Sequence, residues 1–578
     1  MRVLRNPVPA SALVLAATLL ASACSSPPAE PATLVLLNGR IVTVDSTQPE
    51  AQAVAILDDR IIAVGNDSRI RRYVGDETRV IDLEGRLAVP GFIEGHGHFM
   101  GLGQAKLQLD LTTANEWEDI VAMVAAAVED AAPGEWILGR GWHQEKWSTV
   151  PEPAVEGYPV HTSLSAVSPN NPVYLTHASG HASFVNERAL QAAGITNSTR
   201  DPSGGEIVRD AGGRATGLLR ETAQRLASAA RSRAEGSSTP EEREALARRV
   251  VQLAAEDALS KGITTFHDAG TGFSSIDLFR TMADEGTLPI RLNVMVRGES
   301  LAAMDSLLGS YRMVDYGNGF LTVRSIKRQI DGALGSHGAW LLEPYADLPR
   351  STGLALESVE SLEQLVVIAM REGYQVNTHA IGDRANREVL DVYEHIFAAN
   401  PDSTDLRWRI EHAQHIHPDD VRRFSQLGII ASMQGIHAIS DAPWLAGKLG
   451  EERAEEESYL FRTLWDQGVV IVNGTDTPVE DANPIPSFYG TVARMAADGN
   501  VYTPEQRLTR EEALRTYTLN GAFAGFQEHD LGSITVGKYA DITVLSEDIM
   551  TIPEAEIPAA RVVYTIVGGD VKYDATSR

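Results

Sequence analysis

The sequence predicts an α/β fold: a (β/α)₈ barrel with a small β-sandwich domain built from both ends of the chain and an insertion after the first barrel strand. Three observations predict this fold. Both ends consist of short apolar runs, the middle alternates helical segments with near-continuous apolar strands, and a stretch rich in tryptophan and proline interrupts the alternation. Apolar strands separated by helices are typical of a buried parallel sheet. A doubly wound sheet is the weaker alternative, because no Gly-x-Gly-x-x-Gly motif follows an early strand.

The composition of the 578-residue chain excludes several classes of protein. Hydrophobic residues make up 43% and charged residues 22%, so extensive disorder or a multi-pass membrane protein is not expected. The formal net charge is −28, and no cluster of lysine and arginine offsets it. Such a surface repels the phosphate backbone. We therefore expect no nucleic-acid partner.

The first residues predict export. Arg2 and Arg5 precede an apolar run over residues 10–23, which is too short to span about 30 Å of hydrocarbon and fits the core of a signal peptide. The run ends in Ala21-Ser22-Ala23-Cys24, which resembles a bacterial lipoprotein box whose cysteine becomes the lipidated first residue. We predict a signal peptide over residues 1–23 and a lipidated linker over residues 24–32. The alternative is an ordinary cleaved secretory signal in which Cys24 is incidental.

Lipidation of Cys24 would tether a soluble body to a membrane rather than insert it. We thus expect an exported, membrane-anchored lipoprotein of the bacterial cell envelope, facing the periplasm, with no membrane contact except the N-terminal lipid. Cys24 is the only cysteine, so an internal disulfide is excluded.

The β-sandwich domain is predicted over residues 33–90 and 530–578. Apolar runs at residues 34–37 and 41–44 flank the turn dipeptide Asn38-Gly39. Short apolar runs occur again at residues 541–545 and 561–569. Because both ends of the chain have this pattern and the middle does not, we expect a single β domain that both termini build.

The barrel is predicted over residues 91–529. Thr239-Pro240-Glu241-Glu242 is a capping box with proline at the first helical position, and it predicts a helix to about Ser260. A glycine, an apolar run and a polar end then follow, and this pattern recurs at residues 262–268, 373–379, 428–434 and 468–476. In such a barrel the carboxyl ends of the strands form the active face.

The insertion is predicted at about residues 105–225, between the first and second barrel strands. It contains Trp136, Trp142 and Trp147 close together, as well as several prolines. The tryptophans favour an apolar or aromatic substrate group near the entrance. The alternative is that they pack the core of the insertion.

The candidate metal ligands lie in this middle region, which holds all fifteen histidines. His96-Gly97-His98 follows an apolar strand, and residues i and i+2 of a strand point to the same side, so both imidazoles can meet one cation. His379, His412 and Asp476 also end strand-like segments. Neutral imidazoles and a carboxylate are the donors that Zn²⁺ prefers. Taken alone, each of these residues is better explained as an ordinary polar strand end, and the case for a metal site rests on the set.

Lys327 is the exception in this set. It lies in a strand-like segment, but a cationic ammonium cannot ligate a metal. From the residues alone, a salt bridge or a solvated side chain explains it.

In their order along the chain, these motifs resemble the amidohydrolase superfamily, and within it the amidohydrolase family 3 branch that includes N-substituted formamide deformylases. The resemblance spans roughly residues 33–575, and its motifs lie at residues 90–98, 327–336, 377–383, 409–414, 474–479 and 531–541. Two positions depart from the common pattern. His337 stands where the family commonly has arginine, and Gly141-Trp142-His143 stands where Gly-Trp-Asp is frequent. Both segments are expected to face substrate.

The resemblance implies a metal-dependent hydrolase of small amide-type substrates that cleaves a C–N bond other than a peptide bond. His96, His98 and Asp476 would hold one divalent metal, and His379 and His412 a second, both expected to be Zn²⁺. A Lys327 carboxylated by CO₂ would bridge them as an oxygen donor. A metal-bridging hydroxide would attack the carbonyl, and Asp476 would carry the proton to the leaving nitrogen. Trp142, His181 and His337 are the candidate substrate residues, the two histidines as auxiliary donors to the developing charge.

Two other functions stay open from the sequence. A lyase, decarboxylase or isomerase could use the same metal barrel. A tethered solute-binding lipoprotein would share the signal and the acidic body, but it would not need six ligating residues in ordered strand-end motifs. The substrate, the metal and the oligomeric state are left open, with a homo-oligomer among the options.

Overall fold

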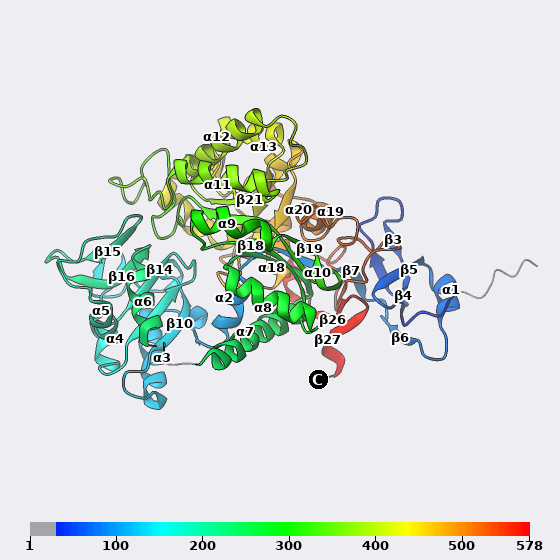
Figure 1. Cartoon of the computed structure of the whole chain (residues 1–578), viewed down its shortest axis with the longest axis horizontal. Helices are drawn as coiled ribbons and strands as arrows, with labels where there is room; N and C mark the ends of the chain where they lie inside the picture. The colour runs from blue at the N-terminus through cyan, green and yellow to red at the C-terminus, as the bar shows by residue number, and fades with distance from the viewer. Residues whose placement is uncertain (1–29, 235, 237–238, 578) are drawn as a thin grey trace, which may run out of the picture.

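A computed structural model describes residues 30–234, 236 and 239–577. The chain forms a central barrel with a sheet domain on one side, built by residues 109–234 (Figure 1). On the opposite side lies a β domain that both ends of the described chain build. Cys24 and the predicted signal peptide lie outside the described residues. Within those residues, no helix combines the length and the apolar character needed to cross a bilayer.

The barrel is a parallel sheet of eight strands in the order of the chain, as predicted. The bounds are β8 (Phe92–Gly97), β17 (Ile263–Thr271), β18 (Arg291–Val296), β20 (Leu321–Gln329), β21 (Gln375–Ala380), β22 (Arg409–His412), β23 (Ile430–Met433) and β24 (Ile471–Asn473). The backbone amide of Asp476 donates to the His96 carbonyl at 2.8 Å, and that of His98 donates to the Thr477 carbonyl at 2.7 Å. These two bonds join the last strand to the first just beyond β24, where the site residues lie.

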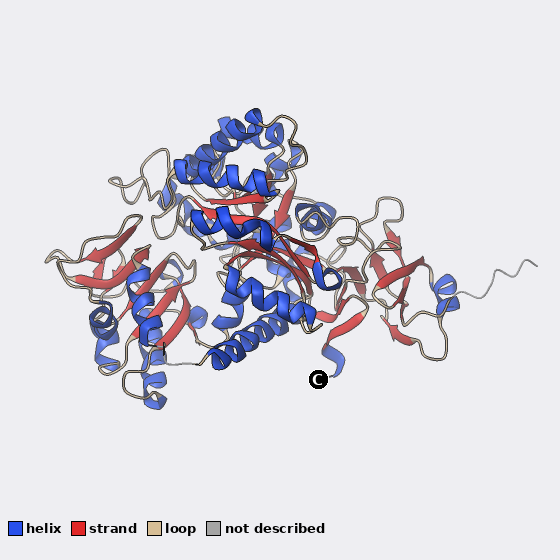
Figure 2. Ribbon diagram, in the orientation of Figure 1, coloured by secondary structure: helices blue, strands red, loops and turns tan. Residues whose placement is uncertain are grey.

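Helices cover the outside of the barrel (Figure 2). The predicted capping box is present: the Thr239 side chain accepts from the Glu242 amide at the start of α7 (Pro240–Ser260), and Glu242 accepts from the Thr239 amide. The other helices that follow barrel strands are α2 (Phe99–Ala105), α8 (Phe273–Asp284), α9 (Leu301–Tyr311), α11 (Val359–Glu372), α12 (Asp383–Ala399), α13 (Pro418–Leu427), α14 (Gly435–Ser440), α15 (Ala442–Leu449), α16 (Glu451–Glu457), α17 (Phe461–Asp466), α18 (Pro484–Ala493), α19 (Arg510–Thr516) and α20 (Leu519–Ala524). Their apolar faces and the barrel strands share one large hydrophobic core.

The chain between β8 and β17 forms a mixed six-stranded sheet in the order β15-β16-β14-β13-β10-β9. Its bounds are β9 (Leu109–Asp110), β10 (Ile137–Trp142), β13 (Val173–His177), β14 (Ala182–Val185), β15 (Gly205–Arg209) and β16 (Ala215–Glu221), with helices α3 (Trp117–Asp130), α4 (Thr162–Val167), α5 (Glu187–Ala193) and α6 (Gln224–Ala234). This sheet has hydrophobic clusters of its own. It therefore packs as a separate layer beside the barrel mouth, where it supplies side chains to the site.

The β domain consists of two sheets. One has the order β5-β4-β1-β6 and the other the order β27-β26-β25-β7-β2-β3. The bounds are β1 (Leu34–Leu37), β2 (Arg40–Val42), β3 (Glu50–Ala51), β4 (Ala53–Leu57), β5 (Arg60–Gly65), β6 (Arg79–Asp82), β7 (Leu87–Pro90), β25 (Ile542–Leu545), β26 (Val562–Val567) and β27 (Asp570–Asp574). In the second sheet β25 pairs antiparallel with β7, so the two ends of the described chain share one sheet.

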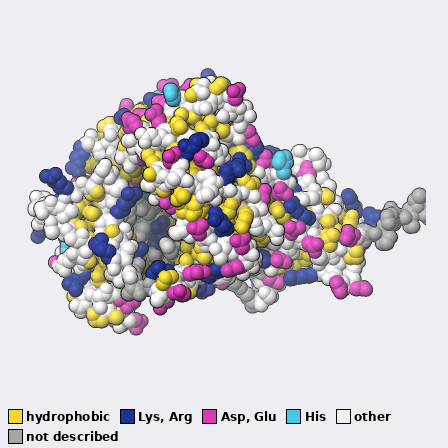
Figure 3. Space-filling view, in the orientation of Figure 1, with side chains coloured by type: hydrophobic (Ala, Val, Ile, Leu, Met, Phe, Trp, Pro, Cys, Tyr) yellow, Lys and Arg dark blue, Asp and Glu magenta, His cyan; other side chains and the backbone are white. Residues whose placement is uncertain are grey.

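Figure 3 shows one face of the whole molecule. Acidic and basic side chains are interspersed on it.

Candidate metal centre

The six predicted ligand residues come together at the carboxyl ends of the barrel strands. They lie in or directly after β8, β20, β21, β22 and β24. The ring centroids of His96 and His412 are 4.7 Å apart, those of His379 and His412 4.4 Å, and those of His96 and His98 5.7 Å. Side chains from distant parts of the sequence therefore form one cluster of imidazoles.

The tightest group in this cluster consists of His96, His412 and Asp476, whose candidate ligand atoms all lie within 4.8 Å of one another. Asp476 Oδ1 is 3.4 Å from His96 Nε2 and 3.1 Å from His98 Nε2. The resemblance pairs His412 with His379. In the structure, His412 lies next to His379 on one side and next to His96 and Asp476 on the other.

Lys327 lies inside the cluster rather than at the surface. Its side chain is 2% exposed, and its Nζ is 3.1 Å from His96 Nε2. Among the described residues, no carboxylate forms an ion pair with this amine. Burial lowers the pKa of Lys327 to about 7. A solvated or salt-bridged lysine, the alternative left open by the sequence, is therefore not what the structure shows.

The donor set fits a divalent metal. Burial lowers the pKa values of His96, His379 and His412, which keeps these imidazoles in the neutral form that ligates metals. Burial alone would raise the pKa of Asp476, but the neighbouring His96 and His98 outweigh it and hold that pKa well below its usual range. His379 Nε2 and Asp476 Oδ1 are buried and make no well-formed hydrogen bond within the described chain. Buried polar atoms of this kind normally have a partner, and a metal would provide one.

Two partners orient the imidazoles toward the cluster. Glu411 Oε2 contacts His96 Nδ1, and Arg409 Nε lies 2.7 Å from Glu411 Oε1. Gln434 Oε1 is 2.9 Å from His412 Nδ1. Both histidines therefore direct Nε2 at the cluster, an arrangement common around ligated histidines. Sequence reasoning did not single out Glu411 or Arg409, although their i, i+2 spacing in β22 was the signal that both face the barrel interior.

The backbone at the site is strained and tightly held. His412 has φ 75° and Asp476 has φ 55°, in the left-handed region that non-glycine residues rarely adopt. Such residues cost about 1–3 kcal/mol each and cluster at functional sites. Glu94 accepts from the Thr475 amide at 2.7 Å and from its hydroxyl at 3.0 Å, which ties the Asp476 segment to the strand of His96.

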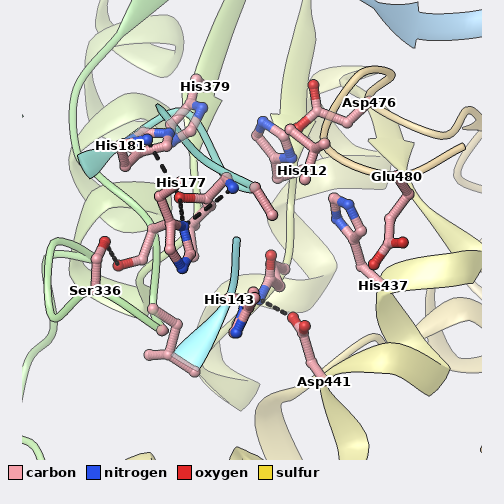
Figure 4. Close-up of a pocket in the computed structure, with 18 of the residues that line it drawn as sticks. His143, His177, His181, Ser336, His379, His412, His437, Asp441, Asp476 and Glu480 are labelled. Carbon is pink, nitrogen blue, oxygen red and sulfur yellow. Dashed lines mark hydrogen bonds between the residues drawn. The ribbon is translucent and has the colours of Figure 1, made fainter. Parts of the chain in front are cut away.

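A cavity opens beside the cluster (Figure 4). His379, His412 and Asp476 of the cluster line it. The sheet between β8 and β17 contributes His143, His177 and His181. The segments that follow β20, β22, β23 and β24 contribute Leu334, Ser336, Gln414, His437, Asp441, Trp444 and Glu480. The barrel and the inserted sheet thus form the walls of the cavity together. His437, Asp441 and Trp444 were not identified from the sequence.

His181 lies in the cavity wall beside the imidazole cluster. It lines the cavity, its ring centroid is 5.3 Å from that of His379, and its Nδ1 is 2.9 Å from Glu221 Oε2. Burial lowers the pKa of His181, but the negative charge of Glu221 and the hydrogen bond to Glu221 raise it by more, so this pKa lies above its usual value. Its contact with substrate stays a prediction.

Two candidate substrate residues, Trp142 and His337, do not line this cavity. Trp142 is fully buried behind His177, with ring centroids 4.6 Å apart, and its Nε1 donates to the Leu175 carbonyl at 2.9 Å. Trp142 packs the core of the inserted sheet, as the alternative interpretation held.

His337 is also withdrawn from the wall. Its Nε2 lies 3.0 Å from Asp347 Oδ2 and 3.2 Å from Lys448 Nζ, and the residue is 8% exposed. These contacts hold His337 between the buried Lys448 and the exposed Asp347, while its neighbours Gly335 and Ser336 reach the cavity. A direct role in binding substrate is therefore not supported.

The barrel and its cluster of imidazoles with a carboxylate define a metal-dependent hydrolase. A model described as the amidohydrolase family (Amidohydro_3) matches residues 79–573, and the chain belongs to that family. Its site lies at the strand ends where such enzymes hold their metals.

Curated relatives span almost the whole chain. Protein LONG AFTER FAR-RED 3 of Arabidopsis thaliana is 36% identical, covering 94% of this chain and 92% of its own. The putative amidohydrolase YtcJ of Bacillus subtilis is 30% identical and covers 93% and 98%. The N-substituted formamide deformylase of Arthrobacter pascens is 29% identical and covers 94% and 98%.

Solved structures have the same architecture. A metal-dependent hydrolase of Pyrococcus horikoshii has a TM-score of 0.71 and 26% identity, over 90% of this chain and 99% of that one. The zinc complex of atrazine chlorohydrolase TrzN from Arthrobacter aurescens has a TM-score of 0.52 and 16% identity, over 94% and 95%, a likeness of fold alone.

Proposed function

We propose that this protein hydrolyses a C–N bond of a small amide, formamide or cyclic amide. The observation that carries the proposal is the buried group of His96, His412 and Asp476, with ligand atoms within 4.8 Å, beside a cavity lined by His412 and Asp476. The 29% identity with an N-substituted formamide deformylase supports the class of bond.

The chain's own residues would hold the metal ions and move a proton. His96, His98, His379, His412 and Asp476 would hold two divalent ions, zinc by the nature of the donors, with a carboxylated Lys327 as the bridging oxygen donor. When bound, such ions polarise a carbonyl and lower the pKa of water. Asp476, with its oxygens beside the imidazoles and at the cavity wall, would accept the proton of the attacking water and donate it to the leaving nitrogen. His181 would donate to the developing negative charge.

Metal analysis combined with a substrate screen tests this function. The purified protein should contain up to two divalent ions per chain and should hydrolyse some N-acyl, N-formyl or cyclic amides. The summed products should be heavier than the substrate by one water. Products of unchanged summed mass would indicate a lyase, decarboxylase or isomerase on the same barrel, and tight binding without turnover would indicate a solute-binding protein.

We also propose that the protein is exported and anchored through a lipid on Cys24. The proposal is supported by Ala21-Ser22-Ala23-Cys24 after the apolar run. Labelled palmitate should enter the mature protein, and Cys24→Ser should release it into the soluble fraction. Unchanged labelling and membrane association in that variant would contradict the anchor.

A further inference from the structure

The part of the wall that the described residues form has carboxylates at two places and no lysine or arginine. Among the described residues that line it, Asp441, Asp476 and Glu480 are acidic, and none is lysine or arginine. Asp476 belongs to the metal-ligand cluster. Asp441 and Glu480 lie with His437 on one side of the cavity, opposite His181 and His379 (Figure 4). We call His437, Asp441, Trp444 and Glu480 the acidic end.

Three cationic side chains outside the wall each have a partner other than Asp441. Lys146 Nζ lies 3.2 Å from Glu480 at the surface, and Lys448 Nζ lies 2.8 Å from Asp347. Arg140 donates to the backbone carbonyl of residue 178 at 2.9 Å. Glu480 is thus partly compensated, and neither Lys448 nor Arg140 forms an ion pair with Asp441.

Asp441 has no lysine or arginine as an ion-pair partner among the described residues. It accepts a hydrogen bond from the Tyr459 hydroxyl and a long one, at 3.4 Å, from Gln414 Nε2. Asp441 is half-buried, so leaving its carboxylate without an ion-pair partner has a cost, and a cationic ligand would reduce that cost.

Trp444 provides an aromatic side chain in the same cavity wall as this carboxylate. It lies one turn along α15 from Asp441, whose carbonyl accepts from the Trp444 amide at 3.0 Å. The indole also lies near His143, with ring centroids 6.0 Å apart. A carboxylate next to an aromatic ring is a setting that favours an ammonium group through charge and cation–π attraction.

We propose that the substrate carries a protonated amine at the end remote from the scissile bond, held by Asp441 against Trp444. The inference rests on the proposed function, because it takes the cavity as the substrate site. The amide carbonyl lies toward the imidazole cluster, and the ammonium lies toward the acidic end. Substrates with a carboxylate at that end are disfavoured, since the wall there offers no cation to receive it.

Calorimetric binding of benzylammonium and of benzyl alcohol, its neutral analogue, tests the inference without requiring turnover. The metal-loaded protein should bind benzylammonium at least about 10-fold more tightly than benzyl alcohol. Asp441→Asn should reduce this ratio to near one, because it removes the charge and keeps the shape. Equal affinities in the wild-type protein, or an unchanged ratio in Asp441→Asn, would overturn the proposal.

Two control variants separate the charge from other effects. Tyr459→Phe removes the hydrogen bond to Asp441 but leaves the carboxylate, so the preference for the cation should persist. Asp419→Asn removes the same charge at an exposed position, where the side chain is 84% exposed, and should leave both affinities unchanged. A loss of the preference in Asp419→Asn would show a general charge effect and overturn the role of Asp441.

The binding ratio and the proposed function can fail separately. If the cation preference depends on Asp441 but no amide is hydrolysed, the binding role of the acidic end is supported and the proposed reaction is contradicted. If amides are hydrolysed and benzylammonium and benzyl alcohol bind equally, the proposed reaction is supported and the role of Asp441 is contradicted.

Discussion

The amine of Lys327 lies 3.1 Å from Nε2 of His96, inside a buried cluster that contains one carboxylate group, Asp476, among four histidines. Two divalent ions held by neutral imidazoles and one aspartate would be under-compensated in such a place. A carboxylated Lys327 would supply the missing negative charge and bridge the ions.

Lys327→Ala should therefore abolish activity and reduce the amount of bound metal. Short-chain carboxylates such as acetate should partly restore both in this variant, and wild-type apoprotein should need bicarbonate for full reactivation. Metal analysis and turnover on the same preparations check this. If Lys327→Ala keeps both metals and near-normal turnover, Lys327 is a structural residue and the bridged site is wrong.

Glu411→Gln should weaken metal binding without unfolding the protein. Glu411 contacts Nδ1 of His96 and is itself paired with Arg409, so it fixes which ring nitrogen faces the cluster. Loss of such a partner typically costs about 10- to 100-fold in metal affinity or activity. Competition with a zinc chelator measures the loss. Glu452→Gln, a change at an exposed position of α16, serves as the control and should have no effect. Equal zinc affinity in Glu411→Gln and Glu452→Gln would show that Glu411 does not support metal binding.

Trp142→Ala should destabilise the protein and leave its substrate preference intact. The fully buried indole packs the core of the inserted sheet, and such truncations cost about 3–5 kcal/mol. Thermal denaturation measures the loss, and Trp142→Phe should show a smaller one. A variant with normal stability and a changed KM would restore Trp142 as a substrate contact.

Glu457 should make the protein less stable as the pH rises. Burial, with the charge of Asp383 adding to it, raises its pKa to about 7 from 4.5 in the unfolded chain. The folded state therefore holds the proton more tightly, and the stability this gives is complete below about pH 4.5 and is lost as the pH rises through 7. Glu457→Gln should unfold with a free energy higher than wild type by about 1–3 kcal/mol at pH 8. The two proteins should agree near pH 4.5. Denaturant titration at both pH values checks this, and a pH-independent difference would contradict it.

The sequence predicted the parts of the site that follow strand periodicity. His96 and His98 follow from the i, i+2 rule, and His379, His412 and Asp476 follow from their places at strand ends. Lys327 could be placed only through the resemblance, because the spacing gives no reason for a cation among metal ligands.

The rest of the cavity has no such periodic signal. Asp441 and Trp444 sit at the start of a short helix beyond β23, and only the folded chain shows that this helix forms a wall. The sequence could not place Trp142, because an aromatic residue is equally suited to a core and to an entrance, and its burial in the folded chain distinguishes the two. It could not place the ring of His337 either, because its partners Asp347 and Lys448 are 10 and 111 residues further along the chain.

The central claim is that the imidazole cluster works only with metal bound. Titrating chelated apoprotein with Zn²⁺, while bound metal and amide hydrolysis are measured together, tests it most directly. The account predicts that apoprotein is inactive and that activity rises with bound metal to a limit of two ions per chain, fewer in His379→Ala or His412→Ala. Full activity in protein that retains no metal would contradict the assignment of the site.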